Sequence, residues 1–351
     1  MCRDPLRCII PSYMLKKLAQ SDNRVLRESA REDLQQSKQV RKRRMAALPT
    51  KATKLEKAEA ASVRKLRLVY STNSGIMLPG KLLRAEGQGP CGDKAADEAY
   101  VYSGHTYDFF WKVLKRSSVD GAGMPLISTV HYFEKYDNAF WDGTQMVYGD
   151  GEGIVFNRFT ASLDIVAHEL THGVISFTSD LEYDHQPGAL NEHFADVFGV
   201  LVKLWRKGWT ATEALKKDGW LIGKEIVVQA PGRKALRSMS EPGSAYNNDK
   251  YLGNDEQPWH MSNFYKGADD EGGVHINSGI PNHAFFVTCM TLGGKPWLRA
   301  GRIWYEAMIK LKSRASFQKC AEMTYLKARE LYGSKECSAV RKGWKTVGIE
   351  F

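Results

Sequence analysis

Two histidines four residues apart are the residues of this chain whose spacing most directly suggests chemistry. His168 and His172 lie in the stretch Asp-Ile-Val-Ala-His-Glu-Leu-Thr-His-Gly, residues 164–173. On a helix, this spacing places both imidazoles on one face, one turn apart, where together they can hold one zinc ion. Glu169 would lie beside the open coordination positions and could take a proton from a zinc-bound water. The alternative is an accidental pair of surface histidines, so a third ligand is needed.

A second stretch, residues 188–196, contains candidates that would complete such a site. Catalytic zinc typically keeps three protein ligands and one open position, and Glu192 is a candidate for the third ligand. Asp196 lies one helical turn further on the same face, where it could accept the free ring N–H of a liganding histidine and fix its tautomer. Two ordinary surface carboxylates are the alternative. The stretch is otherwise apolar, and carboxylates facing a core are costly without a metal or partner.

Hydrophobic periodicity predicts the elements that must position these residues. The two stretches fall on predicted helices, 159–176 and 189–207, and another helix is predicted over 97–115. Short β-like runs precede the first motif, and helices follow the second. The predicted runs are 66–70, 71–75, 76–84, 126–132, 138–141 and 145–149, and the later helices are 278–293, 297–311, 315–332 and 335–346. We expect a cleft between a β-rich half and a helical half, floored by the first motif helix.

Composition indicates a globular chain of about two domains. Of its 351 residues, 43% are hydrophobic and 26% are charged. No run reaches the roughly 18 apolar residues needed to span a membrane, and the N-terminus lacks an apolar core of signal-peptide length. We therefore expect no membrane contact, and a location in the cytoplasm or export by an unconventional route to the outside. Six cysteines without a Cys-x-x-Cys pair resemble scattered free thiols, although an even number leaves disulfides open.

The net charge of +10 is concentrated in the first 65 residues, which hold 17 Lys/Arg and 7 Asp/Glu. This asymmetry indicates that residues 1–65 are a separate functional unit. Residues 11–47 read as helical, and 50–65 as an exposed helix or linker. The basic run 41–44 has three interpretations: a solvated charged face, a processing site, or a nucleic-acid contact. The last is the least favoured, because no aromatic residues lie among the charges.

Together with the two metal-binding stretches, further segments resemble the thermolysin-like zinc metallopeptidases. The resemblance covers residues 66–351, in order and with family-like spacing. Residues 138–141, Asn-Ala-Phe-Trp, resemble the edge strand that binds the substrate backbone. Asn138 and Ala139 could offer amide groups to an extended peptide, as in strand addition. Without the resemblance, Asn138 would be read as an ordinary residue at a strand end.

Three further residues would act on the substrate. Tyr183 lies eleven residues after the second motif histidine, where the family has a transition-state tyrosine. Residues 270–279 resemble the segment with the catalytic histidine, here His275, whose imidazole Asp270 could orient and charge. The resemblance implies that Arg237 binds a substrate carbonyl through its planar fork. The alternatives are a packed core tyrosine, a satisfied histidine beside turn glycines and a surface arginine.

Residues 11–19 resemble the short propeptide of the protealysin-like branch of this family. The usual pair of prolines in that motif is reduced here to Pro11. The resemblance implies that the N-terminal segment is an intramolecular inhibitor, which occupies the cleft until it is removed. We expect the boundary between about residues 60 and 70, before Val69.

The chain departs from thermolysin at the paired calcium site of that family. Asp164 remains at one ligand position, but the other matching positions hold Lys203, Leu221 and Lys224. Lysines at former calcium ligands argue against a calcium site there. We expect one of these ammonium groups to neutralise Asp164 directly.

The sequence therefore predicts an α+β, two-domain thermolysin-like fold with a central zinc-binding helix. The predicted parts are a basic helical propeptide and linker (1–65), a β-rich catalytic domain with the zinc helix (66–195) and a helical domain (196–351). The predicted function is a zinc endopeptidase of proteins and peptides, made as an inhibited precursor and open to a proteinaceous inhibitor. The resemblance implies a preference for a bulky apolar residue after the cut bond, in a pocket that Ile165 and Leu236 could line.

Two rival functions belong to other classes. One is a binding protein that keeps the zinc but does not cleave peptides. The loss of a catalytic residue would favour this function, and no catalytic residue is lost here. The other is a nucleic-acid-associated protein acting through residues 1–65, for which salt-sensitive DNA binding would be the sign.

Overall fold

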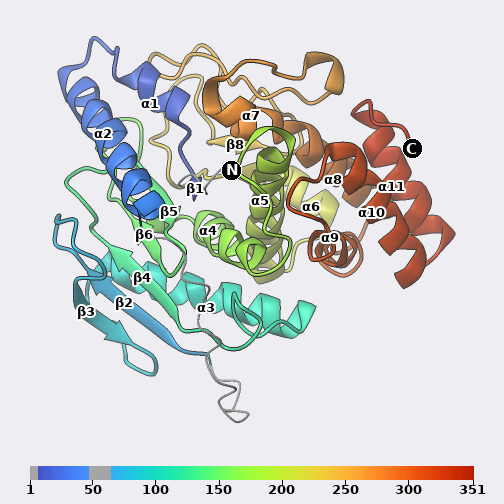
Figure 1. The fold of residues 1–351 in the computed structure, drawn as a ribbon, viewed down its shortest axis with the longest axis horizontal. Helices are drawn as coiled ribbons and strands as arrows, with labels where there is room; N and C mark the ends of the chain where they lie inside the picture. The colour runs from blue at the N-terminus through green and yellow to red at the C-terminus, as the bar shows by residue number, and fades with distance from the viewer. Residues whose placement is uncertain (1–6, 47–64) are drawn as a thin grey trace.

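The structure, a computed structural model, describes residues 7–46 and 65–351 of the chain. Within these residues, one mixed six-stranded sheet lies in the N-terminal half (Figure 1). In sheet order its strands are β1 (Arg7–Cys8), β5 (Ala139–Trp141), β6 (Met146–Tyr148), β4 (Leu126–Val130), β2 (Arg67–Ser71) and β3 (Lys81–Ala85). β2, β4 and β6 run parallel, and the other pairings are antiparallel. The N-terminal segment thus supplies one edge of the sheet.

Two of the predicted β-like runs differ from the structure. Residues 71–75 leave β2 as a turn, in which Asn73 and Ser74 have positive φ angles of 50° and 64°. The run 76–84 becomes a strand only at Lys81. Pro79 has no N–H to donate to a strand ladder, which explains the late start.

Three helices carry or support the motif residues. They are α3 (Lys94–Leu114), α4 (Leu163–Ser176) and α5 (His185–Lys207). α3 packs against β2 and β4 on one side and α4 on the other, and α4 lies between α3 and α5 (Figure 1). The single helix predicted over 159–176 is wrong at its start. A short 3₁₀ turn, η1 (Phe159–Ala161), comes first, and Ser162 then adopts an extended backbone before α4 begins.

A glycine allows α4 and α5 to approach closely. A Cβ atom at Gly199 of α5 would lie 2.5 Å from the carbonyl oxygen of Asp164 and 3.5 Å from the Cβ of His168. Any larger residue would push the helices apart. The close approach brings the faces of α4 and α5 that carry the motif residues into contact.

The C-terminal half is mainly helical, as the sequence predicts. Its elements are α6 (Ala211–Lys216), β7 (Leu221–Ile222), β8 (Arg237–Ser238), η2 (Met261–Asn263), α7 (Asp269–Asn277), α8 (Gly279–Leu292), α9 (Ala300–Met308), α10 (Phe317–Leu331) and α11 (Ser334–Thr346). Large aromatic residues fill its core, where the buried rings of Trp304 and Trp344 are parallel and 6.3 Å apart. The predicted α+β architecture with a β-rich half and a helical half is confirmed.

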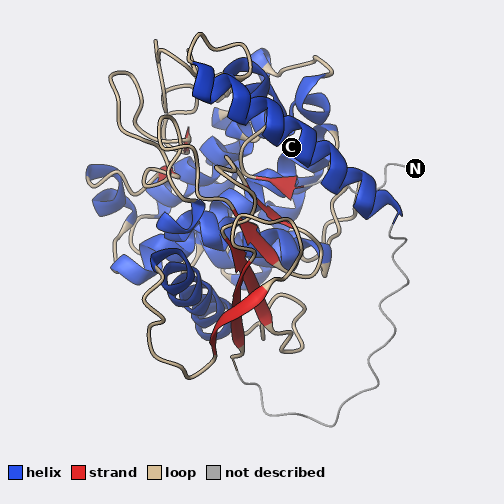
Figure 2. Cartoon of the chain, turned by 90° about the vertical axis from the view of Figure 1, so that its left-hand side faces the viewer, coloured by secondary structure: helices blue, strands red, loops and turns tan. Residues whose placement is uncertain are grey.

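The N-terminal segment forms two helices, α1 (Ser12–Leu18) and α2 (Arg24–Ala46). α2 is the long helix that runs along one side of the molecule, as Figure 2 shows. α2 contacts aromatic residues of the catalytic half, where Gln36 of α2 donates a hydrogen bond to the Tyr132 hydroxyl at 2.7 Å. Ser29 donates to the carbonyl oxygen of Lys135 at 3.2 Å. Residues 50–64 of the predicted linker, and residues 60–64 of the predicted boundary region, lie outside the described residues.

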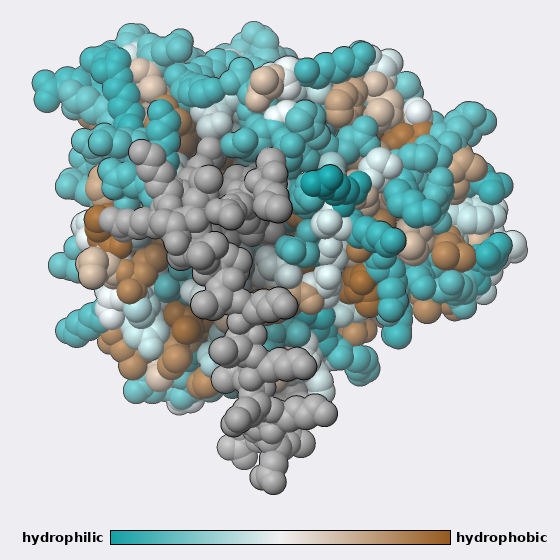
Figure 3. All heavy atoms as spheres, viewed as in Figure 1, coloured by the Kyte–Doolittle hydropathy of each residue, from teal (hydrophilic) through white to brown (hydrophobic). Residues whose placement is uncertain are grey.

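No helix among residues 7–46 and 65–351 is long and apolar enough to cross a membrane. Figure 3 shows one face of the molecule, which is largely hydrophilic with hydrophobic residues in small groups.

Candidate metal and catalytic centre

The two motif histidines and Glu192 converge at the contact of α4 with α5. All three side chains are buried, and one ligand atom from each lies within 4.8 Å of the others. The Nε2 atoms of His168 and His172 are 3.1 Å apart. The carboxylate oxygens of Glu192 lie 3.5 Å from Nε2 of His168 and 3.4 Å from Nε2 of His172. In the described part of the chain, these three residues form the only such group of potential metal ligands.

The opposite ring nitrogens of both histidines are held by polar partners. Nδ1 of His168 donates to Asp196 at 2.9 Å, and Nδ1 of His172 faces the side-chain oxygen of Asn191 at 2.8 Å. Arg237 binds Asp196 through two hydrogen bonds of 2.7 and 3.0 Å. Such partners fix the ring orientation and direct both Nε2 atoms to one point. Sequence reasoning missed Asn191, although it directly precedes Glu192 in the second stretch.

Burial and neighbouring charges define the electrostatics of this centre. Burial lowers the pKa of His168, but the carboxylates of Asp196 and Glu192 outweigh it and raise the pKa to about 9. Burial acts to raise the pKa of Glu192, yet the histidines around it hold that pKa well below its usual range. The centre therefore concentrates negative charge that would attract a cation.

Glu169 has the environment expected of a group that works on a water molecule. It is fully buried, and burial raises the pKa of its carboxyl well above the usual range. Among the described residues, neither carboxylate oxygen of Glu169 has a hydrogen-bond partner, and Oε2 of Glu192 also has none. Buried polar atoms are almost always satisfied, so these oxygens indicate a site built for further ligands. Two imidazoles and one carboxylate are a donor set typical of catalytic zinc, and the residues present fit that ion.

Tyr183 and His275 approach the same centre from the loop before α5 and from α7. The Tyr183 hydroxyl donates to Glu192 and lies 3.1 Å from Nε2 of His275. Asp270 accepts from Nδ1 of His275 at 2.6 Å and from its backbone N–H at 2.7 Å. Burial lowers the pKa of His275, but Glu192 and Asp270 raise it to about 9. The imidazole can thus present an N–H toward the centre.

The residues predicted to bind a substrate backbone contact the N-terminal segment instead. Asn138 accepts from the N–H of Ile10 at 2.9 Å and donates to its carbonyl oxygen at 3.0 Å. The N–H of Ile9 donates to the carbonyl oxygen of Ala139 at 3.1 Å. Arg237 donates to the carbonyl oxygen of Ile9 at 3.2 Å.

The strand at Arg7–Cys8, and the contacts of Ile9 and Ile10 beside it, were not predicted. β1 pairs antiparallel with β5, with Cys8 opposite Phe140. Two residues are too few for an alternating pattern, so the apolar run Cys8-Ile9-Ile10 was the only signal in the sequence.

The calcium-ligand positions hold an ion pair. Nζ of Lys203 lies 2.6 Å from Asp164, and it also donates to the carbonyl oxygen of Leu221. The expected pairing of Asp164 with a lysine is therefore present. Lys224 lies elsewhere, paired with the exposed Asp218.

Comparisons with known proteins agree with this geometry. Residues 33–176 match the family model of the thermolysin metallopeptidase catalytic domain, and residues 179–349 match that of its alpha-helical domain. An extracellular metalloprotease of Pectobacterium carotovorum subsp. carotovorum is 43% identical over 348 residues, covering 99% of this chain and 97% of that protein. Protease PrtS of a Photorhabdus species is 46% identical over 288 residues, covering 81% of this chain and 76% of that protein.

A solved structure matches almost the whole chain. The precursor of protealysin, a metalloproteinase from Serratia proteamaculans, superposes with a TM-score of 0.87 at 41% identity, covering 98% of this chain and 99% of that one. The arrangement of the two halves is thus shared with that precursor. This chain belongs to the thermolysin family of zinc metallopeptidases and is a metalloendopeptidase.

Proposed function

We propose that this chain is the precursor of a zinc endopeptidase and that its N-terminal segment inhibits the active site. The observation that carries the proposal is a set of hydrogen bonds to the backbone of residues 9–10, made by the side chains of Asn138 and Arg237 and by the carbonyl oxygen of Ala139. An extended peptide substrate needs the same edge of the sheet. Substrate and segment therefore compete for one place.

His168, His172 and Glu192 would hold the zinc, which when bound polarises the scissile carbonyl and activates a water molecule. Glu169 takes a proton from the attacking water and delivers it to the leaving amine. The raised pKa of its buried carboxyl suits a group that both accepts and returns a proton. Asp196 holds His168 in the tautomer that leaves Nε2 for the metal.

Tyr183 and His275 stabilise the negative charge that develops on the substrate carbonyl oxygen. Both offer hydrogen-bond donors at the same point, 3.1 Å apart. Asp270 keeps the imidazole of His275 oriented and charged. Preorganised donors of this kind contribute strongly to acyl-transfer reactions.

We further propose a preference for a bulky apolar residue directly after the cut bond. Ile165 and Leu236 are fully buried, or nearly so, and belong to the same apolar cluster. Both approach Gly223, where an added Cβ would lie 3.1 Å from Leu236 and 3.2 Å from Ile165. An apolar wall of this kind favours apolar side chains over charged ones.

Two further proposals concern calcium and location. The Lys203–Asp164 ion pair supports the absence of the paired calcium site, because the ammonium supplies the charge that calcium would supply. The name of the Pectobacterium relative, an extracellular metalloprotease, supports action outside the cell.

The test is hydrolysis of casein by the full-length chain after zinc addition, followed over time together with the N-terminal sequence of the protein. Glu169→Gln removes the proton acceptor while keeping the shape of the side chain, and we expect it to abolish hydrolysis. A chelator should do the same to the unaltered chain. Undiminished hydrolysis by Glu169→Gln would refute the mechanism, and stoichiometric zinc without turnover would favour a silent binding protein.

A further inference from the structure

We propose that the Cys8–Ile9 peptide bond lies in the scissile position of the chain's own cleft and is the first bond that the enzyme hydrolyses. The inference rests on the proposed function and adds a cleavage site to it. This site differs from the expected boundary between residues 60 and 70. The N-terminal strand is therefore a bound substrate as well as an inhibitor.

The backbone of the segment has the direction and register of a substrate strand. β1 runs antiparallel to β5, and Cys8 lies opposite Phe140. The N–H of Ile9 and both backbone groups of Ile10 are bonded to Ala139 and Asn138. On the C-terminal side of the Cys8–Ile9 bond, the backbone of the segment is thus bound to the edge of the sheet at both Ile9 and Ile10.

The carbonyl group of Cys8 lies at the catalytic donors. Its oxygen accepts a hydrogen bond of 2.8 Å from Nε2 of His275. The same nitrogen lies 3.1 Å from the Tyr183 hydroxyl and 3.5 Å from Oε2 of Glu192, one of the metal-ligand candidates. Among the carbonyl groups of residues 8–10, that of Cys8 is the one bound by a residue proposed to stabilise the developing charge.

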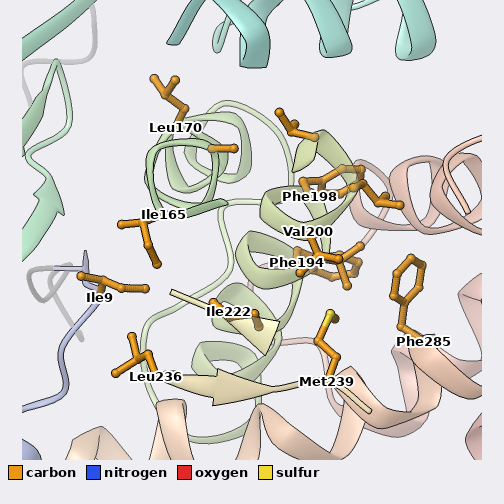
Figure 4. Packing of buried hydrophobic residues seen from close by; sticks show 14 of the residues in the cluster. Ile9, Ile165, Leu170, Phe194, Phe198, Val200, Ile222, Leu236, Met239 and Phe285 are labelled. Carbon is orange, nitrogen blue, oxygen red and sulfur yellow. The ribbon is translucent and has the colours of Figure 1, made fainter. Parts of the chain in front are cut away.

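The next residue fills the pocket proposed for the position after the cut. Ile9 is completely buried and lies between Ile165 and Leu236 in Figure 4. Its carbonyl oxygen accepts from Arg237, whose guanidinium is itself held by Asp196. The bond before Ile9 is therefore flanked by a bound carbonyl on each side and by an occupied apolar pocket.

Water is the only co-reactant that this hydrolysis consumes. Water adds to the carbonyl carbon of Cys8, a C–O bond forms and the C–N bond to Ile9 breaks. Glu169 takes the proton from the water and transfers it to the nitrogen of Ile9, which leaves as the new N-terminus. The cut separates residues 1–8 and so removes β1 from the sheet. Ile9 and Ile10 then remain joined to α1 and α2, without the strand residues Arg7 and Cys8.

The experiment uses the full-length chain, purified with a chelator and then supplied with zinc. Intact-mass measurement should show loss of residues 1–8, and N-terminal sequencing should begin at Ile9. Because the strand already lies in its own cleft, the initial rate should not change over a ten-fold range of protein concentration. Glu169→Gln with zinc should stay intact.

Substitution of the pocket residue tests the register. Ile9→Asp places a carboxylate in the apolar pocket and should slow this cut by roughly ten-fold or more. Ile9→Leu conserves volume and should cut at a rate within a few-fold of the unaltered chain. Hydrogen exchange in the metal-free chain gives a readout without chemistry. The amides of Ile9 and Ile10 should be protected in the unaltered chain and in Ile9→Leu, and exposed in Ile9→Asp.

The failure of this inference is distinguishable from the failure of the proposed function. If casein is hydrolysed with zinc and Glu169 but no chain ever begins at Ile9, the inference is wrong and the enzyme assignment stands. A first cut at another bond, or equal rates for Ile9→Asp and Ile9→Leu, would also overturn it. If neither casein nor the chain itself is cut, the proposed function is what fails.

Discussion

At the scale of single residues, the hydroxyl group of Tyr183 has a role that can be separated from metal binding. It lies between Glu192 and His275, and burial raises its pKa well above the usual range, so it remains a donor. Tyr183→Phe removes this donor and keeps the ring. We expect kcat to fall by about 100-fold with little change in KM, measured on a peptide substrate.

The control for this prediction is zinc content. The three ligands are unchanged in Tyr183→Phe, so the variant should bind one zinc per chain. A kcat within a few-fold of the unaltered enzyme would contradict the assignment of Tyr183 to charge stabilisation.

Lys203 is a second residue whose role is open to direct measurement. Its ammonium is the partner of the fully buried Asp164. Lys203→Ala leaves that carboxylate uncompensated, and we expect the free energy of unfolding to fall by about 3 kcal/mol or more. The change in the free energy of unfolding is measured by denaturant titration of the metal-free protein, with Glu169→Gln present in every variant. Lys224→Ala removes an exposed pair and should cost about 0.5 kcal/mol or less. Equal effects of the two substitutions would contradict the calcium-replacement role.

At the scale of elements, α2 meets the catalytic half through a group of buried carboxyls. Asp33 of α2 accepts from the backbone N–H of Asp137 at 3.0 Å, and the N–H of Glu152 donates to Asp137 at 2.8 Å. Burial raises the pKa of Asp33 and of Asp137 well above the usual range, and Glu152 raises both further. Asp33 and Asp137 are therefore more protonated when the segment is docked than when it is released.

This group predicts how docking of the segment depends on pH. Both pKa values are raised in the docked state. The two carboxyls therefore stabilise docking fully below about pH 4, and this stabilisation weakens as the pH rises. Each group contributes up to about 1.4 kcal/mol per pH unit until its own pKa is passed. In the uncut Glu169→Gln chain, exchange protection factors of α2 should fall as the pH rises above about 4. Asp33→Asn should reduce this dependence, and a rise in protection with pH would contradict the prediction.

At the scale of the whole molecule, the metal site joins the two halves of the fold. α4 follows the β-rich part, whereas Glu192 lies on α5, which leads into the helical part. A metal bound across this contact stabilises the folded chain by about 4 kcal/mol when free zinc exceeds its Kd a thousand-fold. We therefore expect a chelator to lower the melting temperature of the Glu169→Gln chain, and zinc to restore it.

Calcium is the matched control for the metal prediction. Added to the zinc-loaded chain, it should leave the melting temperature unchanged, because Lys203 already neutralises Asp164. A large rise with calcium would refute the proposed absence of the paired site.

The sequence by itself determined the features that depend on local spacing. The interval between His168 and His172 requires one helical face, and apolar periodicity located α4, α5 and α8 to α11 within a few residues, but not α6 or α7. The resemblance supplied Tyr183, Arg237 and His275 by order along the chain. Local patterns could not supply Asn191 as a partner of His172, because the spacing within one helix does not show which residue of another helix a side chain will face.

Only the tertiary structure decided which residues of the N-terminal segment fill the cleft, and in which register. Ile10 pairs with Asn138 across 128 positions of the chain, and the carbonyl of Cys8 meets His275 across 267. Pairing over such separations depends on which edge of the sheet the rest of the fold leaves open. A two-residue strand is also too short to show the alternation of apolar and polar residues that predicts a strand. The metal-binding residues could therefore be read from their spacing. The peptide bond that lies at the catalytic centre could be found only from the contact between the N-terminal segment and α7.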